Sequence, residues 1–362
     1  MEKLPGNLLP NGESCAILIF VVTAWDYSSV GQSATLTSWR SMVRAHLIPP
    51  ATARLFEALR FFYFNIIMVG NGKQIQKELK HMRMQTMNGG ELPRIGQGTW
   101  FLGEHPERAQ EEMAALQAGV EAGMTLIDTA EMYGNGASEI LIGKAIRHMD
   151  RDGLFLVSKV YPSNAGGARL ERSCEDSLRR LGTDVIDLYL LHWRGSIPFA
   201  RTIEGMRKLQ QEGKIRYWGV SNLDRDDMEE LRRAGGSDCQ VDQVLYHLGS
   251  RGVEYDLLPY LQEKHMPMMA YCPLAQAGSL RRGLMQSPAV REVANRHGWT
   301  AAQVLLAFAA QPEGVIAIPR SSRKEHTLLN AAMEHEHLTP ADMEILNAAF
   351  PAPDDPEPLD IV

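Results

Sequence analysis

The most constraining feature of this sequence is a series of short apolar runs that alternates with helix-like segments from residue 95 onward. Most of these runs are continuously apolar, which is typical of parallel strands buried on both faces. We therefore expect eight strands, at residues 95–100, 125–130, 154–160, 185–193, 215–222, 239–246, 267–274 and 315–320.

The segments between these runs have apolar residues at helical spacing. The segment at 106–123 begins with proline and acidic residues and ends in glycine, as helices often do. Further helices are predicted at 166–182, 203–214 and 339–350, and Thr339 with Asp342 resembles a capping box at the start of the last one.

Eight strand–helix units in about 270 residues predict an α/β fold, a (β/α)8 TIM barrel. A doubly wound parallel sheet is the alternative. It is less favoured because the dinucleotide fingerprint is incomplete: "GQGTWF" (96–101) has the first two glycines and lacks the third. A P-loop is also absent from the sequence.

Residues 1–81 differ from the rest of the chain. They carry 8 Lys and Arg against 5 Asp and Glu, and they show no sustained helical or strand period. The stretch at 25–50 resembles a transfer-RNA gene translated in a protein frame. We expect residues 1–81 to be an over-extended gene start, with translation beginning at Met82, Met84 or Met87, and residues 82–362 to be the barrel domain. The alternative is a genuine, poorly ordered extension.

Composition and charge limit the kinds of molecule that this protein is expected to bind. The net charge of −7 argues against nucleic acid as a main partner, because phosphate binding requires a basic surface. The four cysteines form no CxxC pair, so we expect free thiols in a reducing cytoplasm. The longest apolar runs are too short or are interrupted by charges, which predicts no membrane span. No signal peptide is expected, because Glu2 and Glu13 stand where positive charge is usual and no clear cleavage site of small residues follows.

Polar side chains recur at the carboxyl ends of the predicted strands, which in a barrel face the active site. A lysine inside the apolar run 154–160 is costly to bury without an opposite charge. A lone histidine or tyrosine at such a position is more often part of the core, so only the set as a whole is informative. The set comprises Asp128, Tyr133, Lys159, His192, Ser221, Asn222, Gln243, Tyr271 and Arg320.

Four of these residues suggest proton donation by a phenol. A free tyrosine has a pKa near ~10, so it is a weak acid at neutral pH. We expect Lys159 to lower the pKa of Tyr133, Asp128 to hold the lysine, and His192 to orient a carbonyl oxygen. This arrangement suits reduction of a carbonyl group by hydride from a nicotinamide.

The same residues and their spacing resemble the aldo-keto reductase superfamily, from Leu92 to Val362. Asp128, Tyr133, Lys159 and His192 match the catalytic tetrad of that family. The resemblance implies that NADPH lies extended across the barrel mouth, which would account for the missing fingerprint. It also implies a set of cofactor contacts: Ser221, Asn222 and Gln243 to the nicotinamide amide, Tyr271 to its ring, Pro273 and Leu274 along the pyrophosphate, Arg320 and Ser321 to the 2′-phosphate, and Asn330 to the adenine.

Two positions depart from the family pattern. Arg320 stands where a lysine is usual, and a guanidinium is an excellent phosphate partner. His326 stands where an arginine is common, which leaves the preference for NADPH over NADH open, although Arg323 and Lys324 are close in sequence.

The substrate expectation also comes from the resemblance. "LIDTAEMYGNG", "VSKVYPSNAGG" and "LYLLHWRGS" are similar to a compact bacterial subgroup that reduces methylglyoxal and other small aldehydes. Trp100, Tyr161 and Trp193 are expected to wall a small substrate pocket; packing at the barrel mouth is the alternative. No metal is expected, because "EHEH" (334–337) has no partner motif and reads as a solvated loop.

The leading expectation is thus a cytoplasmic NADPH-dependent reductase of small carbonyl compounds, monomeric or a homo-oligomer. A cofactor-sensing subunit with slow turnover is the alternative from another class, since the tetrad alone does not exclude it. The sequence also leaves the physiological direction of the reaction open.

Overall fold

The computed structural model describes residues 89–276 and 278–362. Within these ranges the chain forms a sheet of eight parallel strands in the order in which they occur along the sequence. The strands are β1 (Gln97–Gly98), β2 (Leu126–Asp128), β3 (Phe155–Val160), β4 (Ile186–Leu191), β5 (Ile215–Ser221), β6 (Asp242–Leu245), β7 (Met268–Tyr271) and β8 (Val315–Ile318).

The sheet closes on itself through backbone contacts between its first and last strands. Parallel bridges join Ile95 to Ala317 and Gly98 to Arg320. The Gly96 N–H donates to the Ala317 carbonyl at 2.8 Å, and the Gly98 N–H donates to the Pro319 carbonyl at 3.0 Å. The (β/α)8 barrel predicted from the sequence is therefore confirmed, and the doubly wound alternative is wrong.

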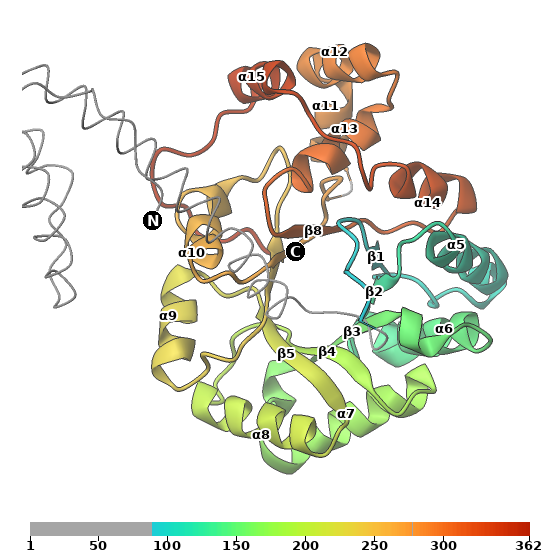
Figure 1. The fold of residues 1–362 in the computed structure, drawn as a ribbon, viewed down its shortest axis with the longest axis vertical. Coiled ribbons are helices and arrows are strands. Elements are labelled where there is room, and N and C mark those ends of the chain that lie inside the picture. Colours follow the sequence, from blue (N-terminus) through green and yellow to red (C-terminus); the bar gives the residue numbers. More distant parts are fainter. Residues whose placement is uncertain (1–88, 277) are drawn as a thin grey trace, which may run out of the picture. The chain divides into compact units, whose positions relative to one another are not determined.

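Helices follow the strands and surround the barrel (Figure 1). In the described part of the chain, five short 3-10 helices accompany them: η1 (Pro106–Arg108), η2 (Tyr133–Gly136), η3 (Arg151–Gly153), η4 (Pro162–Asn164) and η5 (Gly252–Glu254). The α-helices are α5 (Ala109–Glu121), α6 (Ala137–Ile146), α7 (Gly167–Leu181), α8 (Phe199–Gln211), α9 (Arg225–Arg233), α10 (Leu257–Glu263), α11 (Ser279–Gln286), α12 (Pro288–His297), α13 (Ala301–Ala309), α14 (Lys324–Ala331) and α15 (Pro340–Ala349).

The sequence predicted the positions of these elements correctly but overestimated the length of several strands. The predicted strand 95–100 contracts to Gln97–Gly98, because the chain turns away at Thr99 into the loop that carries Trp100. The capping box at the start of α15 is confirmed: the Thr339 hydroxyl accepts from the Asp342 N–H, and the Asp342 carboxylate accepts from the Thr339 N–H.

The core has two parts. Side chains from alternate strand positions fill the barrel interior, among them Leu126, Phe155, Val157, Leu190 and Met269. A larger apolar cluster packs between the outside of the barrel and the helices. This arrangement explains why most strands are continuously apolar: one face of each strand fills the barrel, and the other face packs against helices.

The expectations about the start of the chain, membrane spans and metal sites concern residues that the structure describes only in part. The hypothesis about residues 1–81 lies outside the described residues. In the described part of the chain, no helix combines the length and the apolar character needed to cross a membrane. Over the same residues, no cluster of histidine, cysteine and acidic side chains has the arrangement of a metal site.

Candidate active site

The alternation of side chains along each strand places the predicted site residues at the barrel mouth. In β3, Phe155 and Val157 point into the barrel, so Lys159, two residues further on, does the same. The same spacing relates Leu126 to Asp128 in β2. It recurs from Leu190 to His192, Val241 to Gln243, Met269 to Tyr271 and Ile318 to Arg320. Because parallel strands end at the same rim, these polar groups gather there.

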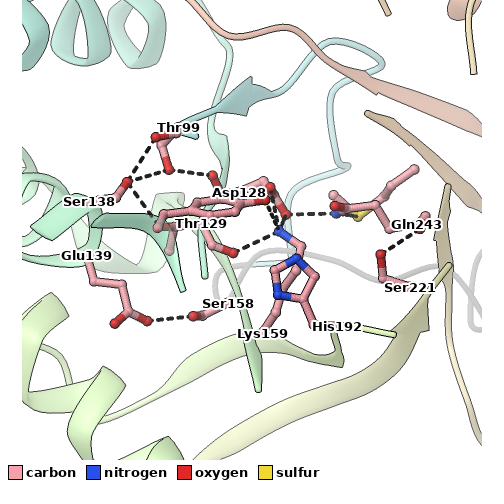
Figure 2. Close-up of polar contacts among 12 residues, drawn as sticks. Thr99, Asp128, Thr129, Ser138, Glu139, Ser158, Lys159, His192, Ser221 and Gln243 are labelled. Atoms are coloured by element: carbon pink, nitrogen blue, oxygen red, sulfur yellow. Dashed lines mark hydrogen bonds and ion pairs between the residues drawn. The ribbon is translucent and has the colours of Figure 1, made fainter. Parts of the chain in front are cut away.

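Lys159 and Asp128 form a buried ion pair in the centre of the site. The Lys159 Nζ donates to Asp128 Oδ1 at 2.8 Å and Oδ2 at 2.7 Å, and to the Thr129 carbonyl at 2.9 Å. Gln243 Nε2 adds a donor to Asp128 Oδ1 at 2.8 Å. Burial lowers the pKa of the lysine and raises that of the aspartate, while each charge opposes the shift of the other. Figure 2 shows the lysine held between these acceptors.

Tyr133 lies within reach of this pair. Its phenol oxygen accepts from Lys159 Nζ at 3.2 Å, and the ammonium also lies 4.9 Å from the centre of the tyrosine ring. The turn that follows contains Gly134 and Asn135 with φ of 56° and 52°, values that glycine and asparagine tolerate better than most residues. The structure therefore brings together the phenol, the lysine and the carboxylate that the sequence had selected.

One electrostatic expectation is wrong for this structure. From the sequence, Lys159 is expected to lower the pKa of Tyr133, whereas burial raises this pKa well above its usual value, and the nearby charge of Asp128 adds to the rise. The reason is that the lysine charge is largely neutralised by Asp128, so the desolvation of the phenolate dominates. Tyr133 consequently keeps its proton at neutral pH and is a hydrogen-bond donor.

His192 completes the group as an uncharged side chain. It lies one residue beyond β4, is 7% exposed, and its ring meets that of Tyr133 edge-on with centroids 5.9 Å apart. Burial lowers the pKa of His192 to about 2, and the charge of Lys159 contributes to the shift. Nδ1 has no hydrogen-bond partner among the described residues. A neutral imidazole is thus available to a polar group in the site.

Further polar residues support the site and were not selected from the sequence. Ser138, at the start of α6, donates to the side chain of Thr99 at 2.8 Å, and Thr129 donates to Ser138 at 3.2 Å. On the other side of β3, Ser158 donates to the buried Glu139 at 2.6 Å (Figure 2). These small polar residues sit in otherwise apolar segments, which is the signal that could have identified them.

The residues expected to contact the nicotinamide form a second, connected network. The Ser221 hydroxyl donates to the Gln243 carbonyl at 2.7 Å, and Asn222 Nδ2 donates to the His192 carbonyl at 3.1 Å. The Tyr271 hydroxyl donates to Asn222 Oδ1 at 2.8 Å. Asn222 adopts φ of 59°, a left-handed conformation that asparagine tolerates. Gln243 contacts Asp128 directly, and the other three side chains are joined to the catalytic residues through Gln243 and the His192 carbonyl.

The residues expected to contact the rest of the cofactor are in the segments that follow β7 and β8. Pro273 and Leu274 are buried in the loop after β7, where Cys272 and Ala275 adopt φ of 52° and 62°. Asn330 is buried on α14, and the Ser321 hydroxyl donates to the Arg323 carbonyl at 2.9 Å.

Arg320, just beyond β8, is exposed and forms no ion pair with any described residue. Burial of its inner part lowers its pKa, and Glu112 opposes this; Arg108 and Arg281 are close enough to lower the pKa further. Two further guanidinium groups and two carboxylates, Glu112 and Glu104, therefore act on Arg320, and the exposed Arg320 guanidinium is free of ion pairs with described residues and available to an anion.

Two of the three predicted pocket residues contact the catalytic group through their rings, and the third contacts one of these two. Trp100 stacks near Tyr133 with ring centroids 6.3 Å apart, and Trp193 lies 4.8 Å from the ring of His192. Tyr161 meets Trp193 edge-on at 5.8 Å. We call Trp100, Tyr133, His192, Trp193 and Tyr161 the aromatic cluster. All three predicted pocket residues are partly exposed, as a wall that contacts a ligand would be.

The segment after α15 returns to this region as well. Ser250 donates to Asp360 Oδ2 at 2.6 Å, and the backbone of Val362 approaches the Tyr271 hydroxyl. The contact of this segment with Tyr271 was not anticipated from the sequence.

Comparisons with known proteins agree with this geometry. The sequence model described as "Aldo/keto reductase family" matches residues 94–350. The chain is 54% identical over 272 residues to methylglyoxal reductase YeaE of Escherichia coli K12, covering 75% of this chain and 95% of that protein. It is 31% identical to glyoxal reductase of Bacillus subtilis 168, covering 72% and 90%. A crystal structure of an aldo-keto reductase from Klebsiella pneumoniae in complex with NADPH is 51% identical, with a TM-score of 0.74, covering 77% of this chain and 99% of that one.

Proposed function

This chain belongs to the aldo/keto reductase family, and we propose that it reduces small aldehydes and dicarbonyl compounds such as methylglyoxal with NADPH. The reaction converts an aldehyde, NADPH and a proton into an alcohol and NADP⁺. The observation that carries the proposal is the contact of Lys159 Nζ with both Asp128 and the Tyr133 hydroxyl, beside a neutral His192.

Tyr133 is the proton donor in this proposal. Its raised pKa keeps the phenol protonated, so it can donate a hydrogen bond to the oxygen of a bound carbonyl. When hydride reaches the carbonyl carbon, the oxygen develops into an alkoxide, which is a stronger base than a phenolate and takes the proton. The phenolate that remains lies 3.2 Å from the Lys159 ammonium, which stabilises its charge.

His192 and Asp128 have supporting roles. A neutral imidazole donates one N–H and is not itself an acid at neutral pH, so His192 is suited to orient the carbonyl oxygen toward Tyr133. Asp128 keeps the lysine charged in a buried position and aims it, because Lys159 donates to both of its carboxylate oxygens.

The residues along the rim suit NADPH, whose nicotinamide supplies the hydride. Ser221, Asn222 and Gln243 present amide and hydroxyl groups that suit a carboxamide. The loop with Pro273 and Leu274 suits the pyrophosphate, and Asn330 suits the adenine. The exposed Arg320, with Arg108 and Arg281 nearby, is suited to the 2′-phosphate, together with Ser321.

The proposed substrate class is based on the aromatic cluster and on the similarity to the two bacterial reductases described above. Trp100, Tyr161 and Trp193 bring three partly exposed rings close to the acid, and such rings favour a small, partly apolar carbonyl compound. We also propose that the enzyme is a monomer, because one chain supplies every group assigned above. We propose the cytoplasm as its location, because its cysteines are expected to be free thiols.

The experiment that tests the function is NADPH consumption by the full chain with methylglyoxal, glyoxal and a panel of small aldehydes. Turnover that depends on the aldehyde supports the proposal. Tight retention of NADPH with no turnover of any of these compounds would contradict it and would favour a cofactor-sensing role.

A further inference from the structure

Three buried hydroxyl groups, on Thr99, Thr129 and Ser138, form a chain of hydrogen bonds that we call the hydroxyl relay. The Thr99 hydroxyl donates to the Asp128 backbone carbonyl at 2.8 Å. Because that carbonyl can only accept, the Thr99 oxygen is left to accept from Ser138, at 2.8 Å, and Ser138 in turn accepts from the Thr129 hydroxyl at 3.2 Å. Ser138 Oγ also lies 3.1 Å from the Thr99 carbonyl, so Thr99 is its acceptor in either arrangement.

The two ends of the relay are the two residues that hold Lys159. Asp128 accepts from Lys159 Nζ through both carboxylate oxygens, at 2.8 Å and 2.7 Å, and the Thr129 carbonyl accepts from it at 2.9 Å. The relay binds the Asp128 carbonyl at one end and the Thr129 hydroxyl at the other (Figure 2). The orientation of all three acceptors of the lysine is therefore fixed by hydrogen bonds that lead to Ser138.

The relay also closes the segment that carries Tyr133. Thr129 directly follows β2, and Ser138 lies in the first turn of α6, so their hydrogen bond joins the two ends of this segment. Between them, residues 134–136 adopt φ of 56°, 52° and 90°. Three left-handed residues in succession do not continue a regular helix, so the position of the tyrosine depends on how the ends of the segment are held.

We infer that Ser138 is a positioning residue for proton transfer, because its hydroxyl holds the Tyr133 segment and the acceptors of Lys159 in one arrangement. The Lys159 Nζ lies 3.2 Å from the Tyr133 hydroxyl oxygen, at the long end of the hydrogen-bond range, so a small displacement weakens this contact. The inference deepens the proposed function and rests on it, since that function requires Lys159 to stabilise the Tyr133 phenolate.

The test measures the rate of hydride transfer in a single turnover. Enzyme loaded with NADPH is mixed with saturating methylglyoxal, and the loss of NADPH absorbance is followed, because product release can limit the steady-state rate. Ser138→Ala should lower this rate by about tenfold, since misalignment of reacting groups by less than ~1 Å already slows catalysis.

The binding of NADPH separates positioning from general damage. The hydrogen-bond partners of Ser138 are not among the residues proposed to bind the cofactor. The dissociation constant of NADPH in Ser138→Ala, measured by quenching of protein fluorescence, should therefore change by less than about twofold, as expected when only transition-state interactions are lost.

The matched control is Ser177→Ala. Ser177 is a buried serine on α7, and it accepts from Arg180 Nη2 at 3.2 Å. This variant removes the same atom from a buried, hydrogen-bonded serine on a helix outside the relay. Its rate of hydride transfer should stay within about twofold of the wild-type rate. Denaturant unfolding of both variants measures the loss of stability, so that equal losses with unequal rates can be recognised.

A second pair of variants tests the relay without changing Ser138. Thr129→Val keeps nearly the same shape and removes the hydroxyl, whereas Thr129→Ser keeps the hydroxyl and removes a methyl group. The relay predicts that Thr129→Val slows hydride transfer by about tenfold and that Thr129→Ser stays close to the wild type. A role in packing alone predicts the opposite order, because only serine leaves a space.

A double variant shows whether Ser138 acts through the acid. In Tyr133→Phe the group that Ser138 positions is already absent, so adding Ser138→Ala should change the residual rate by less than about twofold. A general structural role would lower the rate by the same factor in both backgrounds.

The outcomes separate the inference from the function. If the wild type reduces methylglyoxal and both Ser138→Ala and Thr129→Val keep its rate, the inference is overturned and the proposed function stands. A tenfold loss that is equally large in the Tyr133→Phe background would also overturn the inference. A wild type that reduces neither methylglyoxal nor any small aldehyde would overturn the proposed function and the inference with it.

Discussion

Lys159 Nζ lies 2.7 Å from Asp128 Oδ2 and 3.2 Å from the Tyr133 hydroxyl oxygen, and all three side chains are buried. The lysine therefore connects a fixed negative charge to the group proposed to donate the proton. It can stabilise a phenolate only while the carboxylate keeps it charged and oriented. This arrangement makes each member of the group separately testable.

Tyr133→Phe should lower kcat by about 100- to 10,000-fold, because only the acidic hydroxyl is lost while the ring contacts remain. Binding of NADPH, followed by quenching of protein fluorescence, should be nearly unchanged. Substantial activity in this variant would remove Tyr133 from its proposed role.

Asp128→Asn should cost about 3–5 kcal/mol of unfolding free energy, because a buried ammonium would lose its counter-ion. Activity should fall as well. Denaturant unfolding measures the loss. Asp176→Asn is the control, since Asp176 pairs with the exposed Arg179 and should contribute about 1 kcal/mol or less. Equal losses of unfolding free energy in the two variants would mean that the buried ion pair stabilises the fold no more than an exposed one.

Arg320→Ala should lower kcat/KM for NADPH by about tenfold or more, as expected for a lost charge-assisted hydrogen bond to phosphate. The value for NADH, which lacks the 2′-phosphate, should change much less. Lys144→Ala, which removes an exposed cation on α6, serves as the control. A similar loss with both cofactors would discard the assignment of Arg320 to the 2′-phosphate.

His192 should remain neutral throughout the pH range in which the protein is folded. Because its pKa is lowered to about 2, no step near the ordinary histidine pKa should come from this residue in the pH dependence of kcat/KM between about pH 5 and 9. His192→Gln, which remains a neutral donor, should retain more activity than His192→Ala and show the same pH profile. An acidic limb that disappears only when His192 is replaced would contradict this.

Asp242→Asn should stabilise the protein, increasingly so as the pH rises above the ordinary range of an aspartate. Asp242 is fully buried, no described cation pairs with it, and burial raises its pKa well above the usual value. The folded state thus binds a proton that the unfolded state releases, so stability falls as pH rises through this interval. Asparagine carries no such proton. Melting temperatures of both proteins at mildly acidic and mildly alkaline pH measure the difference, which should shrink toward the acidic end.

Several features of the fold could be read from the sequence because they depend on local pattern. Apolar runs bounded by helix signals gave eight strands in their correct places, and the Thr339 capping box depends on residues only three positions apart. Strand limits were less accurate, since the ends of β1 and β4 depend on where neighbouring strands stop pairing.

The selection of Asp128, Tyr133, Lys159 and His192 also came from the sequence, because each polar residue interrupts or follows an apolar strand. Their mutual distances did not, because they depend on how β2, β3 and β4 align at one rim and on the loop after β2 that carries Tyr133. The direction of the Tyr133 pKa shift was wrong for the same reason. Sequence indicates that a lysine is near, but not that Asp128 already neutralises it or that the phenol is fully desolvated.

The sequence by itself determined the barrel, the family and the residue types at the mouth, since these follow from periodicity and from short motifs. Only the tertiary structure decided which charges are balanced. Glu131 and Asp128 are both acidic residues in one short segment, yet Asp128 faces Lys159 and Glu131 accepts from uncharged donors on the loop after β3. The net charge at a site depends on distances between side chains from different strands, and those distances exist only once the barrel has closed.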